Sequence, residues 1–192
     1  MMNQKTEKLL LDSAAIAEAV ARLGEAVLQD FRNTPDFVLI GLHKQGVPLA
    51  FRLADILEKA SGIRPAVGKL DISMYRDDIG LRSSLPRIRE TEIPFNMEGA
   101  KVLLVDDVLS SGRAVRAALD AVTSFGRPAL IRLAVLIDRG KPEYPIRADY
   151  VGRTAYQVDP SQKIVVNFSE NSGGDAACTV QWHRDGAEMR GE

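Results

Sequence analysis

Two adjacent carboxylates and a loop of small residues give one stretch of this sequence a clear chemical potential. Asp106 and Asp107 follow the apolar run 102–105, and a serine-glycine loop at 110–112 comes shortly after them. Side chains alternate between the two faces of a strand, so the two carboxylates should diverge as the strand ends. Two ionised carboxylates repel each other when they are buried without compensation. The pair therefore suggests a ligand that brings hydroxyl groups or a metal ion.

The loop after the carboxylates has the composition of an anion-binding loop. Ser110 and Ser111 offer hydroxyl groups, and small residues such as Gly112 let an anion approach the backbone closely. A helix is expected from about residue 112, and N–H groups at a helix N-terminus bind phosphate. Carboxylates beside such a cradle suit a polyol phosphate, often with Mg²⁺ bridging its remaining oxygens. A solvated strand end with a serine-glycine turn would explain either half alone, but explains the combination less well.

The elements that must position these residues alternate between strand and helix. This alternation predicts an α/β fold with a largely parallel sheet, in which ligands bind at the carboxyl ends of the strands. Helices are expected from Asp12 or Ser13, from Val47 and from about residue 112. Strands are expected at 37–41, 66–75, 101–106, 129–138, 148–152, 163–168 and 179–184. The loops that follow the first and third of these strands should both lie at the binding edge.

The composition of the chain limits its class. Its 192 residues suit one domain with a sizeable core, and its net charge of −1 draws it toward neither nucleic acid nor membrane. Cys178 is the only cysteine, which fits a reducing cytoplasm. No apolar run approaches the ~18 residues that a membrane helix needs. We therefore expect a cytoplasmic protein without a membrane span.

Two nucleotide-binding alternatives fail on pattern. The loop 41–46 has the glycine spacing of a P-loop, but Val47 and Pro48 stand where lysine and serine or threonine are required. No G-x-G-x-x-G sequence follows a strand. Neither a P-loop ATPase nor a Rossmann dehydrogenase is supported.

These residues carry a resemblance to a known family. LLVDDVLSSGRAVRAAL, residues 103–119, resembles the phosphoribosyl pyrophosphate signature of type I phosphoribosyltransferases. LDISMYRDD (70–78), LAVLIDRG (133–140) and PIRADYVG (145–152) resemble the bifunctional pyrimidine-operon attenuator and uracil phosphoribosyltransferase family. The similarity runs with gaps from about residue 8 to 168. Several separated motifs in the right order make the resemblance more specific than one loop would.

The resemblance implies a fold and a division of the chain. The expected core is that of a type I phosphoribosyltransferase, a mostly parallel twisted sheet flanked by helices, with a small hood. The phosphoribosyltransferase domain with its hood should span 1–168, and 169–192 would be a C-terminal extension of unknown role. Residues 76–97 lack strand or helix periodicity and would include the flexible loop that closes over the substrate.

The resemblance also implies the reaction and its residues. Uracil and phosphoribosyl pyrophosphate would give uridine monophosphate and pyrophosphate, with Mg²⁺ bound to the substrate. The predicted catalytic residues are Asp106 and Asp107, which would face the ribose hydroxyls, and Arg76, which would meet pyrophosphate. The predicted substrate-binding residues are His43, Lys44, Gln45, Gly46, Tyr75, Val108, Leu109, Ser110, Ser111, Gly112, Arg113, Ala114, Ile137, Asp138 and Arg139. Residues 43–46 match the pyrophosphate loop, 110–114 the 5′-phosphate loop and 137–139 the base site, and no metal ligands are assigned.

The sequence departs from the family pattern in both phosphate loops. Lys44-Gln45 stands where Thr-Arg is common, so bidentate guanidinium contact is lost at position 45. Ser110-Ser111 stands where Tyr-Thr is usual, which keeps hydroxyl donors but loses an aromatic surface. His43 is better explained as a loop histidine at the edge of the site than as a base. Arg139 could hold the base or pyrophosphate, or it could form a salt bridge with Asp149.

A basic stretch raises the question of RNA. Family members that attenuate transcription bind a messenger RNA hairpin through a basic face of a dimer, and the resemblance implies a homo-oligomer. Five cations lie within 22 residues of this chain: Arg132, Arg139, Lys141, Arg147 and Arg153. A charge run is usually only a solvated face, and Lys141-Pro142 replaces the frequent His-Arg. We expect a uracil phosphoribosyltransferase, and regulation through binding of pyrimidine-operon mRNA ranks below this activity. The alternatives are an RNA-binding attenuation regulator with vestigial catalysis and a purine phosphoribosyltransferase.

Overall fold

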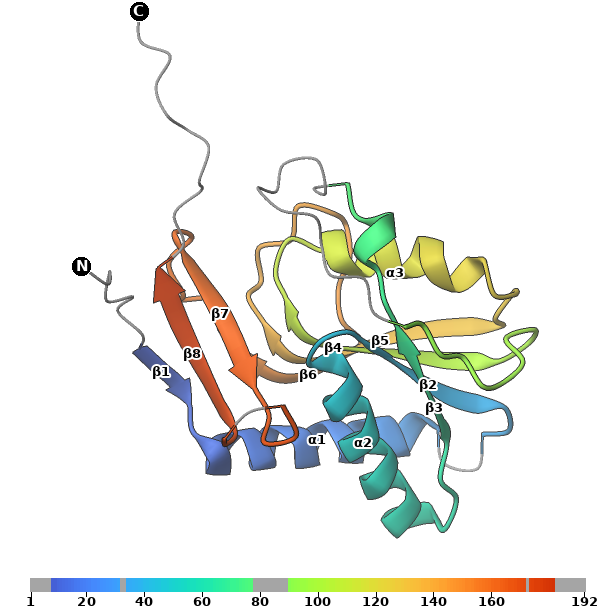
Figure 1. The fold of residues 1–192 in the computed structure, drawn as a ribbon. Helices are drawn as coiled ribbons and strands as arrows, with labels where there is room; N and C mark the ends of the chain where they lie inside the picture. The colour runs from blue at the N-terminus through green and yellow to red at the C-terminus, as the bar shows by residue number, and fades with distance from the viewer. Residues whose placement is uncertain (1–7, 32–33, 78–89, 172, 182–192) are drawn as a thin grey trace, which may run out of the picture.

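The structure of the protein is a computed structural model that describes residues 8–31, 34–77, 90–171 and 173–181. Its helices are α1 (Ser13–Phe31), α2 (Gly46–Ser61) and α3 (Arg113–Thr123), with a short 3₁₀ helix, η1, at Ser73–Tyr75. Its strands are β1 (Lys8–Leu11), β2 (Phe37–Leu42), β3 (Ala66–Leu70), β4 (Lys101–Leu109), β5 (Leu130–Asp138), β6 (Tyr150–Thr154), β7 (Gln162–Asn167) and β8 (Ala176–Gln181). The strands form two sheets, a larger one in the core and a smaller one beside it (Figure 1).

The larger sheet is parallel at every pairing. Its strand order is β3-β2-β4-β5-β6, so β4 lies at the centre, between β2 and β5. Strands of parallel sheets are buried on both faces and therefore read as nearly continuous apolar runs, as 37–42 and 101–105 do. The predicted α/β class with a largely parallel sheet is confirmed.

Helices cover both faces of this sheet. The buried sides of α1 and α2 pack against the face that carries Leu39 and Leu103 (Figure 1). The buried side of α3 packs against the opposite face, which carries Ile40 and Leu104. Neighbouring residues on a strand thus belong to different apolar clusters, and burial of one leucine contributes roughly 1.5–3 kcal/mol. None of the helices in the described ranges combines the length and the apolar character needed to cross a membrane.

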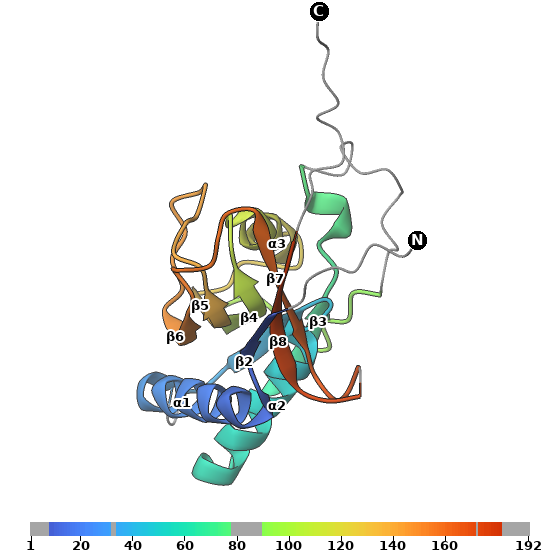
Figure 2. The same ribbon diagram turned by 90° about the vertical axis from the view of Figure 1, so that its left-hand side faces the viewer.

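The smaller sheet forms the hood. It is antiparallel, with β8 between β1 and β7. Ile164, Phe168 and Ala177 point into the apolar cluster that α1 and α2 share, so the hood packs onto the same core. Figure 2 shows β7 and β8 crossing in front of the larger sheet. β8 is the central strand of the hood, and it lies within the predicted C-terminal extension, residues 169–192. The predicted domain boundary at residue 168 stays a prediction.

Some element boundaries differ from the prediction. The strand expected at 66–75 ends at Leu70, because the Oδ1 atom of Asp71 accepts the N–H of Ser73 at 2.7 Å and turns the chain into η1. α1 begins where expected, and the carboxylate that caps it belongs to Asp12.

Two strands of the hood, the outer β1 and the central β8, were missed in whole or in part. β1 was not predicted, and β8 begins three residues earlier than expected. Both are short, and their pairing joins distant parts of the chain, with Lys8 opposite Thr179. Residues 182–184, which the sequence assigned to the last strand, lie outside the described residues, as does most of 76–97.

Candidate active site

Strand β4 carries Asp106 and Asp107 at the carboxyl edge of the larger sheet, but it does not end there. It continues to Leu109, because β5 runs beside it and places Asp138 opposite Leu109. The predicted strand end at residue 106 was therefore too early. Asp106 keeps only 7% of its surface exposed, and its Oδ1 atom accepts the N–H of Asp107 at 3.0 Å. The carboxylates are held within the fold, which argues against a solvated strand tip.

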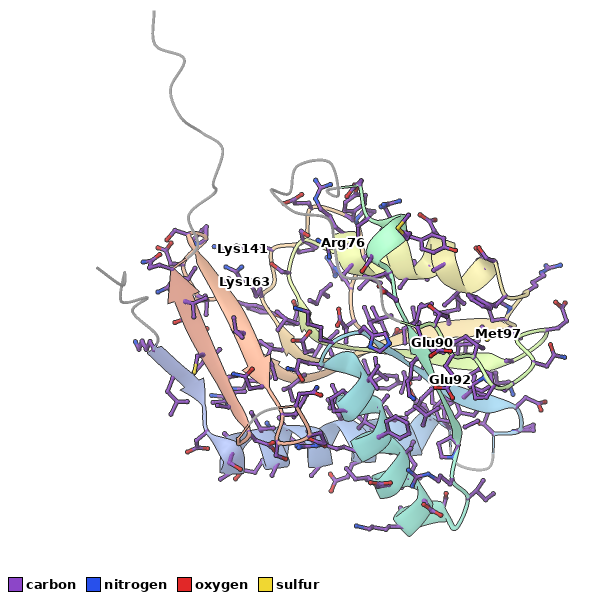
Figure 3. The ribbon with its side chains drawn as sticks, in the orientation of Figure 1. Arg76, Glu90, Glu92, Met97, Lys141 and Lys163 are labelled. Carbon is purple, nitrogen blue, oxygen red and sulfur yellow. The ribbon has the colours of Figure 1, made fainter. Side chains whose placement is uncertain are left out.

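The pKa of both carboxyl groups is raised. Burial is the largest cause for Asp106, followed by the charge of Asp107, and burial is also the largest cause for Asp107. Smaller opposing effects come from two cations, since Arg76 favours the ionised form of Asp106 and Lys163 that of Asp107. Figure 3 shows Lys163 beside the hood strand β7 and Arg76 on the core side, near α3. Burial thus outweighs these two positive charges, and a ligand with further positive charge could stabilise the ionised carboxylates.

The loop before α2 lies against the carboxylate pair. A Cβ atom added at Gly46 would lie 2.3 Å from the carbonyl oxygen of Val105 and 3.1 Å from the Cα of Asp106, so a side chain does not fit there. The peptide bond between His43 and Lys44 is cis. The predicted pyrophosphate loop thus approaches β4 next to the two aspartates.

The other side chains of this loop have separate surroundings. Lys44 is exposed. The Nε2 atom of His43 lies 3.1 Å from the carbonyl oxygen of Glu90, and the Nδ2 atom of Asn171 donates to the Oε1 atom of Gln45 at 3.0 Å. The ring of His43 therefore contacts a backbone carbonyl, and its place at the edge of an active site stays a prediction.

The predicted 5′-phosphate loop turns sharply into α3. Gly112 has φ +85°, in the left-handed region that favours glycine, and it caps α3 without a side-chain hydrogen bond. The hydroxyl of Ser111 accepts the N–H of Arg113 at 3.4 Å. Within the described ranges, no protein acceptor takes the N–H groups of Ser111 and Gly112. Free N–H groups before and within the first turn of a helix are what an anion site requires.

Three predicted binding residues at or beside this loop serve the core. The side chain of Leu109 is buried in the cluster beneath α3, and Ala114 packs against the same cluster. Val108 packs against the opposite cluster, with α1 and α2. Their side chains therefore shape the loop, and only their backbone groups could face a ligand.

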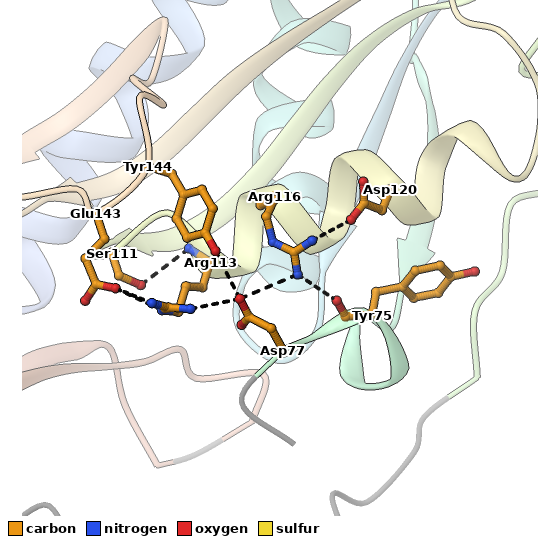
Figure 4. Close-up of polar contacts among 8 residues, drawn as sticks. All are labelled: Tyr75, Asp77, Ser111, Arg113, Arg116, Asp120, Glu143 and Tyr144. Atoms are coloured by element: carbon orange, nitrogen blue, oxygen red, sulfur yellow. Dashed lines mark hydrogen bonds and ion pairs between the residues drawn. The ribbon is translucent and has the colours of Figure 1, made fainter. Parts of the chain in front are cut away.

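The side chain of Arg113 turns away from the loop into a polar cluster (Figure 4). It donates to the carboxylate of Glu143 at 2.6 and 2.9 Å and to that of Asp77 at 2.8 Å. The hydroxyl of Tyr144 also donates to Asp77, at 3.0 Å, and this bond is the largest cause of the lowered pKa of Asp77. The guanidinium of Arg113 thus lies between Glu143 and Asp77, and a role of its backbone in phosphate binding stays a prediction. The predicted Tyr75 has an exposed ring, and its carbonyl accepts a bond from Arg116 of α3.

The predicted base site follows the end of β5. Ile137 is fully buried, and the Oδ1 atom of Asp138 accepts the N–H of Gly140 at 2.7 Å. Arg139 donates to the hydroxyl of Ser110 at 3.3 Å and to the carbonyl of Asp159 at 3.0 Å. Arg139 therefore links the phosphate loop to the segment that leads into the hood.

The suggested salt bridge between Arg139 and Asp149 is wrong. Asp149 pairs instead with Arg132, at 3.0 Å, and accepts the N–H of Leu133 at 2.9 Å. The cause is the position of each residue along β5, since Arg132 lies near the start of this strand and Arg139 follows its end.

The site suits a divalent cation that is carried mainly by a ligand. In the described part of the chain, no group of three or more His, Cys, Asp or Glu residues is placed to hold a metal ion. Asp106 and Asp107 offer the hard oxygen atoms that Mg²⁺ prefers, and their raised pKa values show that a positive charge would be favoured beside them. Two carboxylates with further oxygens from a bound diphosphate would complete a coordination shell.

Sequence reasoning missed two residues near the site. Lys163 was seen only as part of a strand, although its place beside the buried Ile164 predicts that it points to the other face of that strand. Asn171 had no sequence signal, because its partner Gln45 is 126 residues away.

The chain matches a known protein family. The model of the phosphoribosyl transferase domain matches residues 7–172. The chain is 46% identical over 168 residues to the bifunctional protein PyrR of Roseiflexus sp., which covers 88% of this chain and 91% of that protein. It is 41% identical over 178 residues to the bifunctional protein PyrR of Thermus thermophilus, with 93% and 97% covered.

Solved structures share the fold. The hypoxanthine phosphoribosyltransferase of Trypanosoma cruzi superposes with a TM-score of 0.67 at 16% identity, covering 92% of this chain and 97% of that one. A hypoxanthine-guanine phosphoribosyltransferase of Bacillus anthracis gives a TM-score of 0.65 at 18% identity, covering 93% and 99%. At such low identity the likeness concerns the fold alone.

Proposed function

The chain belongs to the phosphoribosyl transferase domain family, and we propose that it transfers the phosphoribosyl group of phosphoribosyl pyrophosphate to uracil. The products are uridine monophosphate and pyrophosphate. The observation that carries this proposal is the buried Asp106 with the half-buried Asp107, beside a loop in which the N–H groups of Ser111 and Gly112 meet no acceptor within the described residues. One ligand with hydroxyl groups at one end and a phosphate at the other would meet both features.

The proposed roles follow from the placement of the residues. Asp106 and Asp107 accept hydrogen bonds from the ribose hydroxyls and stabilise the positive charge that develops on the ribose as the diphosphate leaves. The N–H groups of Ser111 and Gly112 and the first turn of α3 hold the 5′-phosphate. Arg76 and the exposed Lys44 stabilise the diphosphate. Because a diphosphate leaves as an anion, the chain needs no acid to protonate it, which agrees with the engagement of His43 outside the reaction.

Base recognition is assigned to the side of Asp106 and Asp107 that lies toward β5 and the hood. The end of β5, residues 137–139, and the hood strand β7 face this side, and Lys163 of β7 is close enough to favour the ionised form of Asp107. Uracil offers two carbonyl acceptors and ring N–H donors, so backbone groups and one cation can read it. Arg139 positions the phosphate loop against the base site through Ser110.

Mg²⁺ is proposed as a substrate-bound ion that Asp106 and Asp107 would help to hold. When bound, it would offset negative charge on the diphosphate. The protein residues themselves orient the ribose through Asp106 and Asp107 and hold the 5′-phosphate at the loop before α3.

An assay of base specificity tests the proposal. Purified protein with uracil, phosphoribosyl pyrophosphate and Mg²⁺ should form uridine monophosphate in proportion to time and enzyme. Conversion of hypoxanthine or guanine in place of uracil would assign the protein to purine salvage. The same reaction without Mg²⁺ should be slow, and equal rates with and without the ion would remove it from the account.

RNA binding is the second proposed function. Four of the five cations between residues 132 and 153 are exposed, namely Arg132, Lys141, Arg147 and Arg153. Such a group of cations can contact RNA phosphates. The relatives of this chain bear the name bifunctional protein PyrR. A pyrimidine-operon mRNA hairpin should bind with an affinity that falls as salt rises, and uridine nucleotide should strengthen the complex. Hairpin binding without turnover would support a regulator with vestigial catalysis.

We also propose a homo-oligomer and a cytoplasmic location, which light scattering and cell fractionation would test.

A further inference from the structure

The turn between β7 and β8 is fastened to α2 through one arginine. Arg52 of α2 donates to Glu170 at 2.7 and 2.6 Å and to Asp175 at 2.5 and 2.9 Å. Its guanidinium carbon lies 4.5 Å from the ring centroid of the buried Phe168. A further bond joins Arg52 to the hydroxyl of Ser169 at 3.2 Å. We call Arg52, Phe168, Glu170 and Asp175 the Arg52 clamp.

The charged groups of the Arg52 clamp form ion pairs with one another. Only 22% of the Arg52 side chain and 12% of that of Asp175 are exposed. Hydrogen bonds from Arg52 are the largest cause of the lowered pKa values of Glu170 and Asp175. Charge-assisted bonds of this kind fix geometry as well as energy. The turn is therefore held in one position relative to α2.

From this turn Asn171 reaches the loop in front of α2. Its backbone N–H donates to the carbonyl of Phe168 at 2.9 Å, and its Nδ2 atom donates to the Oε1 atom of Gln45 at 3.0 Å. Gln45 is the N-cap of α2 and precedes Gly46, the residue that touches β4 beside Asp106. A contact in the hood is thus joined, through Gln45 and Gly46, to the backbone of β4 at Asp106.

In the structure the oxygen of the Gln45 carboxamide, rather than its nitrogen, faces Asn171. This oxygen is occupied by Asn171, and no acceptor in the described part of the chain takes the Nε2 group. A neutral N–H donor therefore stays available in the loop, at the position where the resembling family commonly has arginine. A donor that is already oriented loses less entropy when a ligand binds.

We propose that Asn171 is a positioning residue for phosphoribosyl pyrophosphate, which orients Gln45 in the loop that binds the diphosphate. This inference rests on the proposed function. The Arg52 clamp holds Asn171, Asn171 holds the carboxamide oxygen of Gln45, and the nitrogen of Gln45 donates to the diphosphate. The hood thereby takes part in binding the donor substrate as well as the base.

Steady-state kinetics with each substrate varied separately test this proposal. Asn171→Ala should raise the KM for phosphoribosyl pyrophosphate about threefold to tenfold, the loss expected for one neutral hydrogen bond. The KM for uracil and the melting temperature should stay at the wild-type values, because Asn171 is exposed, its side chain bonds to Gln45, and alanine keeps the backbone N–H that bonds to Phe168. Asn96→Ala is the matched control, since Asn96 is an exposed asparagine with one local hydrogen bond, to the N–H of Glu98, at the other end of β4.

A double-mutant cycle separates positioning from a general effect. In a Gln45→Ala background, Asn171→Ala should change the KM for phosphoribosyl pyrophosphate less than twofold, because the group that it orients is gone. An unchanged KM in the single variant, an equal rise for uracil, or a full effect in the Gln45→Ala background would each overturn the proposal.

The proposed function can fail independently of this inference. Absence of uridine monophosphate with the wild-type protein would contradict the function. Calorimetric titration of wild type and Asn171→Ala with phosphoribosyl pyrophosphate and Mg²⁺ would then still decide the inference, since it needs no acceptor base. Weaker binding by the variant supports it, and equal binding overturns it.

Discussion

Two pairs of carboxylates in this protein have opposite surroundings. Asp106 and Asp107 lie together on β4, and burial raises the pKa of both. Glu170 and Asp175 share Arg52, whose hydrogen bonds lower the pKa of both. The second pair has its own cation, whereas for the first pair burial outweighs the charges of Arg76 and Lys163.

The opposite pKa shifts distinguish carboxylates that stabilise the fold from carboxylates that are available to a ligand. A protein gains stability when each buried carboxylate meets its cation, as in the Arg52 clamp. The pair on β4 lowers the stability of the free protein at neutral pH, because burial disfavours its ionised form. Such local costs are typical of sites that are shaped for a ligand. Four predictions test this contrast, from the largest expected effect to the smallest.

Removal of a carboxylate from the site pair should abolish most of the activity. Asp107→Asn should lower turnover by about a hundredfold or more, because it removes charge that stabilises the developing positive charge on the ribose. Circular dichroism should show an unchanged fold. Asp120→Asn, which changes an exposed carboxylate of α3, is the control and should keep wild-type turnover. Wild-type activity in Asp107→Asn would remove this carboxylate from the mechanism.

Removal of the cation from the clamp should mainly lower stability. Arg52→Met keeps an apolar chain over Phe168 but leaves two carboxylates without their partner, and we expect a loss of about 2 kcal/mol in the free energy of unfolding. This expected loss in stability is smaller than the loss for a fully buried ion pair, because the Glu170 side chain is 44% exposed. Urea unfolding measures it.

Arg64→Met is the matched control for the clamp. Arg64 also pairs with two carboxylates, Asp55 and Glu58, but all three side chains are exposed. Its loss should leave the urea midpoint almost unchanged. Equal midpoints for the two arginine variants would show that the clamp adds nothing beyond a surface ion pair.

The arginine beside the site pair should behave differently from the arginine of the clamp. Arg76→Ala should lower kcat/KM for phosphoribosyl pyrophosphate about tenfold, the loss expected for a hydrogen bond to a charged group. The melting temperature should change little, and Arg132→Ala should leave substrate use intact. A fall in melting temperature as large as that of Arg52→Met would make Arg76 a structural residue.

The smallest effect concerns pH. Asp106→Asn should raise the melting temperature at neutral pH by about 2–4 °C, which corresponds to about 1 kcal/mol in a chain of this size. Because the folded pKa of Asp106 is raised, the wild type loses stability as pH rises from the unfolded pKa toward the folded one. The advantage of the variant in melting temperature should therefore grow as pH rises and vanish in acid.

Asp175→Asn should show the reverse dependence. The folded pKa of Asp175 is lowered, so its stabilising effect is present above the unfolded pKa and is lost as pH falls through the folded one. The variant should be less stable than the wild type at neutral pH and approach it in acid. Parallel pH profiles for the two variants would contradict the contrast between the pairs.

The sequence predicts what local patterns determine. The parallel α/β core follows from apolar runs and helix signals, and the position of Asp106 and Asp107 at the carboxyl edge follows from the run before them. The left-handed turn at Gly112 agrees with the predicted anion loop. These features depend on residues that are close in the chain.

The features that the sequence does not predict depend on distant partners. Arg52 and Asp175 are 123 residues apart, and β1 pairs with β8 across nearly the whole chain. The partner of Asp149 is likewise set by the positions of Arg132 and Arg139 along β5 rather than by sequence spacing. Such pairings require the fold to be known first.

A competition assay tests the central claim most directly. The protein would receive phosphoribosyl pyrophosphate, Mg²⁺ and equal amounts of uracil, hypoxanthine and guanine, with Asp107→Asn as the blank, and the nucleotides formed would be separated and quantified. We predict uridine monophosphate as the dominant product of the wild type and only traces from the variant. Inosine or guanosine monophosphate as the dominant product, or no nucleotide at all from the wild type, would contradict the account.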